Sequence, residues 1–392
     1  MKREVAFVVL LSAGLTVLVA LFTDAMWPGS AAYERGVDHH YYVQLAQGDP
    51  PSEVRMPFGR RLLTPYLSAV LSALTPLSLA WSFRVLILSC VAATGVMIYA
   101  LSRRFGLGCG ASVVAITSFF SVSWAVEFAA YDFYLPDALG LLLISLAILA
   151  AVSNQTGIFA ALIFAGVLNK ESGVFALPLL YTLNATCLVE PRLALRTVLA
   201  SAPAVAGLLG LRLFIPENHP REYGSYPELF AIFGERLASQ FAVAPVGFVL
   251  SFTVLTFGAA SLFYALCAAK DHATLLLRFA PFVALVYLQP FFAVGQERLL
   301  AVAVPAIALC SAAGAKSLSK AFRIPVYALA ILPLVVLILN LYQTPLAVIR
   351  PGTQALVCLA TLGLLFVAGG IGFGQTYGWE KETEESPEPI KN

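Results

Sequence analysis

Long apolar runs separated by short polar segments dominate the hydropathy pattern of this chain. A transmembrane helix needs about 20 predominantly apolar residues, and many of these runs reach or approach that length. The pattern predicts an all-α fold, a polytopic transmembrane helical bundle with about twelve spans. We place the spans at residues 5–23, 78–102, 109–126, 136–152, 157–168, 172–189, 197–214, 243–268, 276–293, 299–314, 323–342 and 354–374.

The first loop, residues 24–77, contains two segments that predict short helices at the membrane interface. Residues 38–46 mix polar and apolar positions at helical spacing, and a Gly-Asp-Pro-Pro sequence follows them and would end a helix. Residues 61–75 are apolar but short, and Pro65 interrupts them. We therefore expect this second segment to lie at the interface or to dip into it.

The chain is expected to have one transmembrane domain, residues 1–378, and a disordered cytoplasmic tail, residues 379–392. The tail is polar and acidic and contains proline, as disordered segments commonly do. The first apolar run follows two basic residues, but no convincing small-x-small cleavage site precedes Asp24. We therefore expect a retained span rather than a cleaved signal peptide.

Composition excludes several classes of protein. The chain is 59% hydrophobic and 12% charged, and its net charge of +2 gives no nucleic-acid footprint. No P-loop, GxSxG, HExxH or Rossmann motif occurs, which argues against an ATP-driven pump and against a soluble nucleotide-sugar donor. The cysteines lie in or near apolar runs without a CxxC pair, so we expect small buried hydrophobes rather than disulfides or metal ligands. They are Cys90, Cys109, Cys187, Cys267, Cys310 and Cys358.

Basic residues in the short loops predict the orientation of the bundle. If Lys2 and Arg3 are cytoplasmic, the loops containing Arg103, Arg196 and Lys320 are cytoplasmic too. A set of ionisable residues then lies at the extracytoplasmic ends of spans or in outer loops, where such residues are costly and usually functional. We expect one shared polar cavity, formed by Asp38, His39, His40, Arg60, Arg61, Glu127, Asp132, Asp137, Lys170, Glu171, Glu297 and Arg298.

The sequence Asp38-His39-His40-Tyr41-Tyr42 concentrates polar chemistry beside the membrane. A carboxylate at Asp38 could act as general base toward an acceptor hydroxyl, with His39 or His40 binding a phosphate or sharing the proton transfer. The alternative is an interfacial helix whose Tyr and His side chains sit among lipid headgroups. Adjacent helical residues point about 100° apart, so this sequence chelates a metal poorly.

The other outer clusters each have a functional and a structural interpretation. Arg60 and Arg61 could bind a lipid phosphate through planar guanidinium groups, or could snorkel to the interface. Glu127, Tyr131 and Asp132 suit sugar binding as well as an aromatic belt. The remaining charged positions could contact a phosphate, or could form helix-start contacts and self-satisfied ion pairs; they are Asp137, Lys170, Glu171, Glu297 and Arg298.

In these motifs the chain resembles the GT-C superfamily of integral-membrane glycosyltransferases, nearest to bacterial members related to lipid-A and dolichyl-phosphate-mannose-dependent transferases. The resemblance covers roughly residues 5–345 and rests on the order and sidedness of short motifs. These are Asp38 with Tyr41-Tyr42, Pro57-Phe58-x-x-Arg61-x-Leu63-x-Pro65, Tyr131-Asp132 through Pro136-Asp137-Ala138-Leu139, Asn169-Lys170-Glu171, and Glu297-Arg298 with Pro305. Many members have a paired acid where this chain has Asp38-His39.

The resemblance implies a polyprenyl-phosphate sugar donor, transfer on the extracytoplasmic face, and an inverting displacement with Asp38 near the reacting centre. It implies phosphate-binding roles for Arg61, Lys170 and Arg298. We therefore expect a glycosyltransferase of a bacterial inner membrane, acting on a lipid, glycan or protein acceptor among membrane lipids. No cofactor is expected, and the residue pattern does not support a divalent metal. The alternatives are a transporter or flippase for a lipid-linked or small polar substrate, and a non-catalytic assembly subunit.

Overall fold

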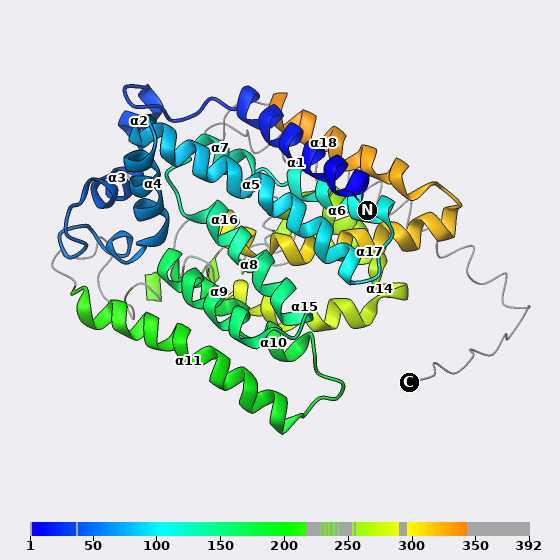
Figure 1. Cartoon of the computed structure of the whole chain (residues 1–392). Coiled ribbons are helices and arrows are strands. Elements are labelled where there is room, and N and C mark those ends of the chain that lie inside the picture. The colour runs from blue at the N-terminus through cyan, green and yellow to red at the C-terminus, as the bar shows by residue number, and fades with distance from the viewer. Residues whose placement is uncertain are drawn as a thin grey trace, which may run out of the picture. The chain divides into compact units, whose positions relative to one another are not determined.

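The computed structural model describes residues 2–36, 38–216, 256–289 and 296–342, together with isolated positions between 228 and 254. Every regular element in these residues is a helix (Figure 1), which confirms the all-α prediction for this part of the chain. The predicted span 354–374 and the predicted tail 379–392 lie outside the described residues. So do parts of the predicted spans 243–268 and 276–293.

Four helices in the described residues are long and apolar enough to cross a membrane. They are Arg3–Phe22 in α1 (Lys2–Phe22), α5 (Leu79–Arg104), α11 (Pro191–Phe214), and Arg298–Phe322. The last one combines α16 (Gln296–Leu300), the 3-10 turn η4 (Ala301–Ala303) and α17 (Val304–Phe322), and it is the most buried of the four. These helices give the chain the character of a membrane protein.

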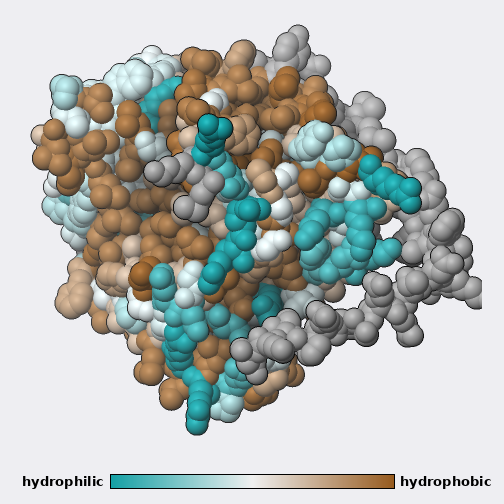
Figure 2. Space-filling view, turned by 45° about the vertical axis from the view of Figure 1, so that its right-hand side comes forward, coloured by the Kyte–Doolittle hydropathy of each residue, from teal (hydrophilic) through white to brown (hydrophobic). Residues whose placement is uncertain are grey.

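The surface agrees with this character. Large apolar side chains are exposed along α1 and α11, among them Leu10, Leu21, Leu213 and Phe214. In the space-filling view of Figure 2, hydrophobic residues cover wide areas of the visible face, and strips of hydrophilic residues cross them. Apolar patches of this extent are rare on soluble monomers.

Shorter helices complete the described bundle. They are α4 (Leu63–Leu74), α6 (Cys109–Phe120), α8 (Asp137–Val152), α9 (Thr156–Asn169), α14 (Ala259–Asp271), α15 (Ala273–Val286), η5 (Val326–Ala330) and α18 (Ile331–Tyr342). The bounds of α8 and α9 lie within a residue of the predicted spans. Helix α6 ends at Phe120, before the predicted end at 126.

Two predicted spans are not continuous helices. The stretch predicted at 172–189 consists of a 3-10 segment, η2 (Glu171–Ala176), and a short helix, α10 (Leu179–Thr182). Pro178 lies between them and has no N–H to continue a helical hydrogen-bond ladder. Within 243–268, α14 begins only after Gly258, whose φ of +74° is strained for residues other than glycine.

The first loop carries α2 (Ala31–Arg35), α3 (Asp38–Gln47), η1 (Phe58–Arg60) and α4. Helix α3 confirms the predicted short helix, and the chain leaves it through Gly48 at a φ of +101°. Helix α2 was not predicted; Ser30 caps it by accepting a hydrogen bond from the amide of Tyr33 at 3.1 Å. The first loop thus folds into short helical segments rather than one extended connection.

Helices α1 and α5 run antiparallel, as contacts at both ends demonstrate (Figure 1). Glu4 in the first turn of α1 pairs with Arg103 in the last turn of α5, with 3.4 Å between Oε1 and Nε. At the opposite end, Arg84 near the start of α5 donates to the carbonyl of Ala20 at 3.0 Å. Glu4 and Arg103 therefore share the end that the basic-residue pattern predicts to be cytoplasmic.

Helices α14 and α17 cross at unusually short range. A Cβ at Gly314 would collide with the carbonyl oxygen of Tyr264, and Ser311 donates to the carbonyl of Ser261 at 2.7 Å. Small residues let helix backbones approach in this way in membrane proteins. The crossing fixes the position of α17. Helix α16, which contains Arg298, leads into α17 through η4.

The cysteines only partly match the expectation of buried hydrophobes. Cys90 and Cys310 are buried, but Cys109 and Cys187 are exposed, and Cys267 is intermediate. Cys109 is the first residue of α6, at the edge of its predicted span, and Cys187 lies beyond the end of α10 although its predicted span continues to 189. All five are free, and Cys358 lies outside the described residues.

Candidate functional site

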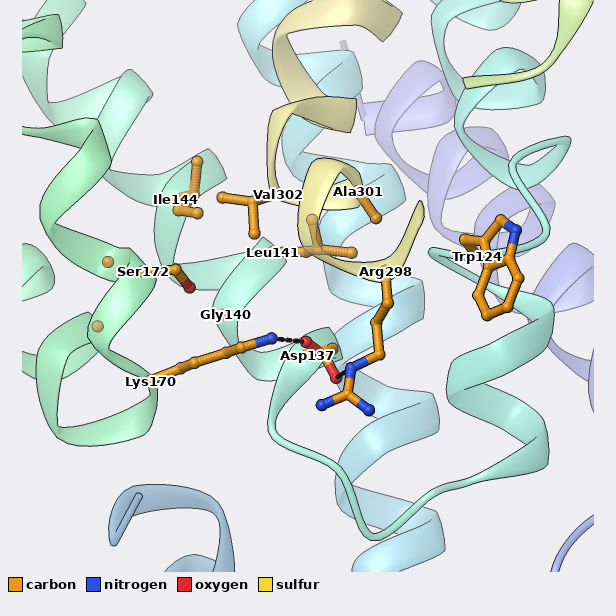
Figure 3. A pocket seen from close by; sticks show the side chains of 12 residues that line it. Trp124, Asp137, Gly140, Leu141, Ile144, Lys170, Ser172, Arg298, Ala301 and Val302 are labelled. Carbon is orange, nitrogen blue, oxygen red and sulfur yellow. Dashed lines mark hydrogen bonds and ion pairs between the residues drawn. The ribbon is translucent and has the colours of Figure 1, made fainter. Parts of the chain in front are cut away.

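Asp137 lies between two cations that come from distant parts of the chain (Figure 3). Its Oδ1 lies 2.5 Å from Nζ of Lys170, and its Oδ2 lies 3.2 Å from Nε of Arg298. Asp137 is the first residue of α8, where a carboxylate also interacts favourably with the helix dipole. Lys170 directly follows α9, and Arg298 belongs to α16.

Arg298 also contacts Asp38, the first residue of α3. The distance from Nη1 of Arg298 to Oδ2 of Asp38 is 3.5 Å, across 260 positions of sequence. The Asp38 side chain is 40% exposed, against 13% for Asp137. One guanidinium therefore contacts two carboxylates, and Asp38 is the one that an incoming molecule can reach.

Arg61 forms the second part of the site. Its Nε lies 3.2 Å from Oε2 of Glu171, and its Nη1 donates to the hydroxyl of Tyr42 at 2.9 Å. Burial raises the pKa of Tyr42 to about 12, so its hydroxyl is neutral at physiological pH. Because Glu171 adjoins Lys170, the two parts join into one group of six side chains. We call this group the charged cluster: Asp38, Arg61, Asp137, Lys170, Glu171 and Arg298.

A buried amide connects the segments that carry the charged cluster. Nδ2 of Asn169 donates to the carbonyl of Pro136 at 2.8 Å, and its Oδ1 accepts from Oγ1 of Thr64 at 2.7 Å. Both Asn169 and Thr64 are fully buried. From the sequence, Asn169 was named only as part of the Asn169-Lys170-Glu171 motif, without a role in the site, and Thr64 was not selected; the available signal was an asparagine at the end of an apolar run, immediately before two charges.

Asp132 lies beside the charged cluster, in the connection from α7 (Glu127–Tyr131) to α8. It is 8% exposed, and within the described part of the chain its Oδ1 has no hydrogen-bond partner. Burial raises its pKa to about 7, which the positive charge of Arg298 opposes and the negative charge of Asp38 assists. Glu127 is also buried, and burial raises its pKa to about 6.

Several predicted site residues lie away from the charged cluster. Arg60 is buried and donates to the carbonyl of Ile215 at 3.1 Å. His39 is fully buried beside Tyr33 and His40, with ring centroids 4.1 and 4.0 Å away. Burial lowers the pKa of His39 to about 4, so its ring is neutral at physiological pH. Arg60 and His39 therefore do not join the predicted shared cavity.

The tyrosines also differ in what they offer. Tyr42 is fully buried, so its ring has no open face for a sugar, and its hydroxyl supports Arg61 instead. Tyr41 is half-buried and stacks on Phe58, with ring centroids 4.8 Å apart. Tyr131 is half-buried at the end of α7. The side chain of Glu297 lies outside the described residues.

A small pocket adjoins the charged cluster and has two kinds of wall (Figure 3). Asp137, Lys170 and Arg298 lie along one side, and apolar side chains face them: Trp124, Leu141, Ile144, Ala301 and Val302. The Arg298 guanidinium lies 5.9 Å from the ring centroid of Phe128, which packs on Trp124. The pocket therefore has charged and apolar side chains on facing sides.

No group of three or more His, Cys, Asp and Glu side chains that could hold a metal ion occurs among the residues that the structure describes. The charged cluster presents three carboxylates and three cations. Comparison with known protein-family models gives no match to this chain, and comparison with curated proteins gives none either.

Proposed function

We propose that this protein is an integral-membrane glycosyltransferase that moves a sugar from a polyprenyl-phosphate donor to an acceptor hydroxyl on the extracytoplasmic side. The observation that carries the proposal is the convergence of the charged cluster. Its members come from the first loop, the start of α8, the end of α9 and α16. Lys170, Asp137 and Arg298 are only 6%, 13% and 18% exposed at the ends of apolar helices. Their burial carries a large desolvation cost, which a function explains more readily than stability does.

The three cations of the cluster suit a leaving phosphate. In transfer from a phosphodiester-linked sugar, negative charge grows on the phosphate as its bond to the anomeric carbon breaks. Arg61, Lys170 and Arg298 are held in place by carboxylates and by Tyr42. Such fixed charges stabilise a developing anion without reorganising during the reaction, and guanidinium groups bind phosphate oxygens in pairs.

Asp38 suits the role of general base. It is the most exposed carboxylate of the charged cluster, and its contact with Arg298 keeps it beside the proposed phosphate site. In a single inverting displacement the acceptor oxygen bonds to the anomeric carbon, its proton passes to Asp38, and the lipid phosphate departs with the bonding electron pair. Asp132 and Tyr131 would contact the sugar between these groups.

The surroundings favour a lipid-linked donor. Apolar side chains lie opposite Asp137, Lys170 and Arg298, so a lipid phosphate bound by the two cations would have apolar side chains nearby. We further propose about twelve spans and a bacterial inner membrane. The Glu4–Arg103 pair, and the 2.8 Å hydrogen bond from Arg196 to Asn154 at the start of α9, support a common cytoplasmic end opposite the charged cluster.

The direct test measures release of polyprenyl phosphate from a radiolabelled polyprenyl-phosphate hexose or pentose by the purified full chain in nanodiscs. We expect release by the wild type and none by Asp38→Asn, which keeps the shape of the side chain but cannot take a proton. Asp49→Asn is the matched control, since Asp49 is an exposed acid in the same loop. Full transfer by purified Asp38→Asn would overturn the assignment.

The same assay separates the alternative of a transporter or flippase. Such a protein would move the labelled donor between leaflets intact, without breaking the bond from sugar to phosphate. Protection of the donor from an added membrane-impermeant reagent measures that movement. Movement of intact donor, with no release of polyprenyl phosphate, would replace the glycosyltransferase proposal by the transporter.

A further inference from the structure

We propose that Asn169 is a positioning residue that sets the spacing of the three segments bearing Arg61, Asp137 and Lys170. The inference rests on the proposed function, because it concerns how that site holds its phosphate-binding cations. Asn169 touches no cation itself. Its amide connects the backbone and side chain of the segments from which those charges project.

Each hydrogen bond of Asn169 runs beside an ion pair. Asn169 bonds to Pro136, and the residues that directly follow these two, Lys170 and Asp137, form an ion pair with each other. The second hydrogen bond joins Asn169 to Thr64. Arg61, three residues before Thr64, pairs with Glu171, two residues after Asn169. A shift of the amide would therefore move both ion pairs.

The chemistry of this position admits few replacements. The carbonyl of Pro136 needs a donor and the hydroxyl of Thr64 needs an acceptor, and a carboxamide offers both from one short side chain. Because Asn169 and Thr64 are fully buried, water cannot replace a lost partner. The backbone hydrogen bond from the Leu62 amide to the Leu168 carbonyl, at 2.9 Å, would still join these segments but would not fix the side chains that follow.

Position matters more for Lys170 than for the arginines. Its ammonium is a single charge on a flexible stem, and one short contact to Asp137 sets its direction. Misplacement of a catalytic group by about 1 Å can cost about a hundredfold in rate. We therefore expect Asn169→Leu to weaken both phosphate binding and sugar transfer by about ten- to a hundredfold.

The test uses dodecyl phosphate as the probe, with binding measured by calorimetry on the full chain in detergent, alongside the transfer assay. Asn184→Leu is the matched control: Asn184 also donates to two carbonyls, those of Ala151 and Leu180, but lies outside the site. We expect Asn169→Leu to bind the probe at least tenfold more weakly than Asn184→Leu. Equal binding by the two variants would overturn the inference.

A double-mutant cycle separates positioning from a general loss of structure. In a Lys170→Gln background we expect Asn169→Leu to cause a smaller further loss than in the wild type, because one of the groups that it positions is absent. An equal loss in both backgrounds would overturn positioning. If Asn169→Leu does not fold, Thr64→Val and Thr64→Ser replace it; only the serine, which keeps the hydroxyl, should bind the probe like the wild type.

Failure of the proposed function is a separate outcome. A wild-type chain that binds dodecyl phosphate but releases no polyprenyl phosphate would refute the glycosyltransferase, and the binding comparison would still decide the role of Asn169. A wild-type chain that does not bind the probe would refute both.

Discussion

Lys170 and Asp137 form a nearly buried ion pair, with 2.5 Å between Nζ and Oδ1 and side-chain exposures of 6% and 13%. Asp137 also faces Arg298 at 3.2 Å, so one carboxylate contacts two cations. The charged cluster as a whole holds three carboxylates and three cations, because Arg298 also pairs with Asp38 and Arg61 pairs with Glu171. Asp137 is the least exposed of these carboxylates, so we expect the stability of this region to depend most on it.

Asp137→Ala should lower the stability of the protein by about 3–5 kcal/mol, since it leaves buried cations without their counter-charge. Adding Lys170→Met should recover part of that loss, because the two changes remove a pair rather than one partner. Thermal unfolding in detergent measures both effects. Asp271→Ala, at an exposed acid that ends α14, is the control. Equal melting temperatures for Asp137→Ala and the wild type would contradict the prediction.

Tyr42→Phe should reduce sugar transfer about tenfold. The change removes the hydroxyl that accepts from Arg61, and an unmade buried hydrogen bond costs about 1–3 kcal/mol, where 1.4 kcal/mol corresponds to tenfold. Initial rates at saturating donor measure the effect. Tyr181→Phe is matched, because the Tyr181 hydroxyl donates to the Leu188 carbonyl outside the site. A similar rate for both variants would show that Tyr42 does not support Arg61 in the reaction.

Asp132→Asn should change how stability depends on pH. An unfolded aspartate titrates near 3.9, whereas burial raises the pKa of Asp132 to about 7 in the folded protein. Between these values the folded state binds a proton that the unfolded chain does not, so stability falls as pH rises from about 4 to about 7. Asparagine does not titrate, and the variant avoids this loss.

Melting temperatures of the wild type and Asp132→Asn, measured from pH 4 to pH 8, test this. They should agree near pH 4, and the variant should be the more stable above pH 7. Other carboxylates titrate alike in both proteins, so their contribution cancels in the difference. A difference in melting temperature that does not vary with pH would refute the raised pKa of Asp132.

Arg298→Lys should lower the rate of transfer by about a hundred- to a thousandfold, the usual effect of removing one donor to a developing anion. A lysine keeps the charge but cannot contact Asp38 and Asp137 at once. Single-turnover rates measure the chemical step. Arg278→Lys provides the control, because Arg278 donates to the Leu183 carbonyl elsewhere. Unchanged single-turnover rates in Arg298→Lys would remove Arg298 from the reaction.

Sequence patterns predicted the elements that local rules determine. Helix α3 follows its polar-apolar spacing and ends at Gly48, and α8 follows Pro136 as a proline-initiated helix should. The six residues of the charged cluster, which the sequence predicted to share a cavity at the outer ends of spans, pair with one another in the structure; the predicted sidedness stays a prediction. Hydropathy did not predict the break within 172–189, where the run is apolar but Pro178 interrupts the helical hydrogen bonds.

Sequence could not determine which neighbour of a pair enters the site. Arg60 and Arg61 are chemically alike, yet η1 ends between them and turns only Arg61 toward Glu171. Tyr41 and Tyr42 also differ in their positions, because only Tyr42 is fully buried and bonds to Arg61. Such choices depend on the twist of one short turn and on distant packing partners, which hydropathy and spacing do not encode.

The close crossing of α14 and α17 at Gly314 acts on Arg298 from roughly 24 Å away, at about 1.5 Å of helix per residue. Any larger side chain there would collide with the Tyr264 carbonyl and tilt the helix. A genetic screen for conditional alleles should therefore recover temperature-sensitive substitutions at Gly314, far from every reacting group. Substitutions that impair this protein are therefore expected well outside the residues that take part in the reaction.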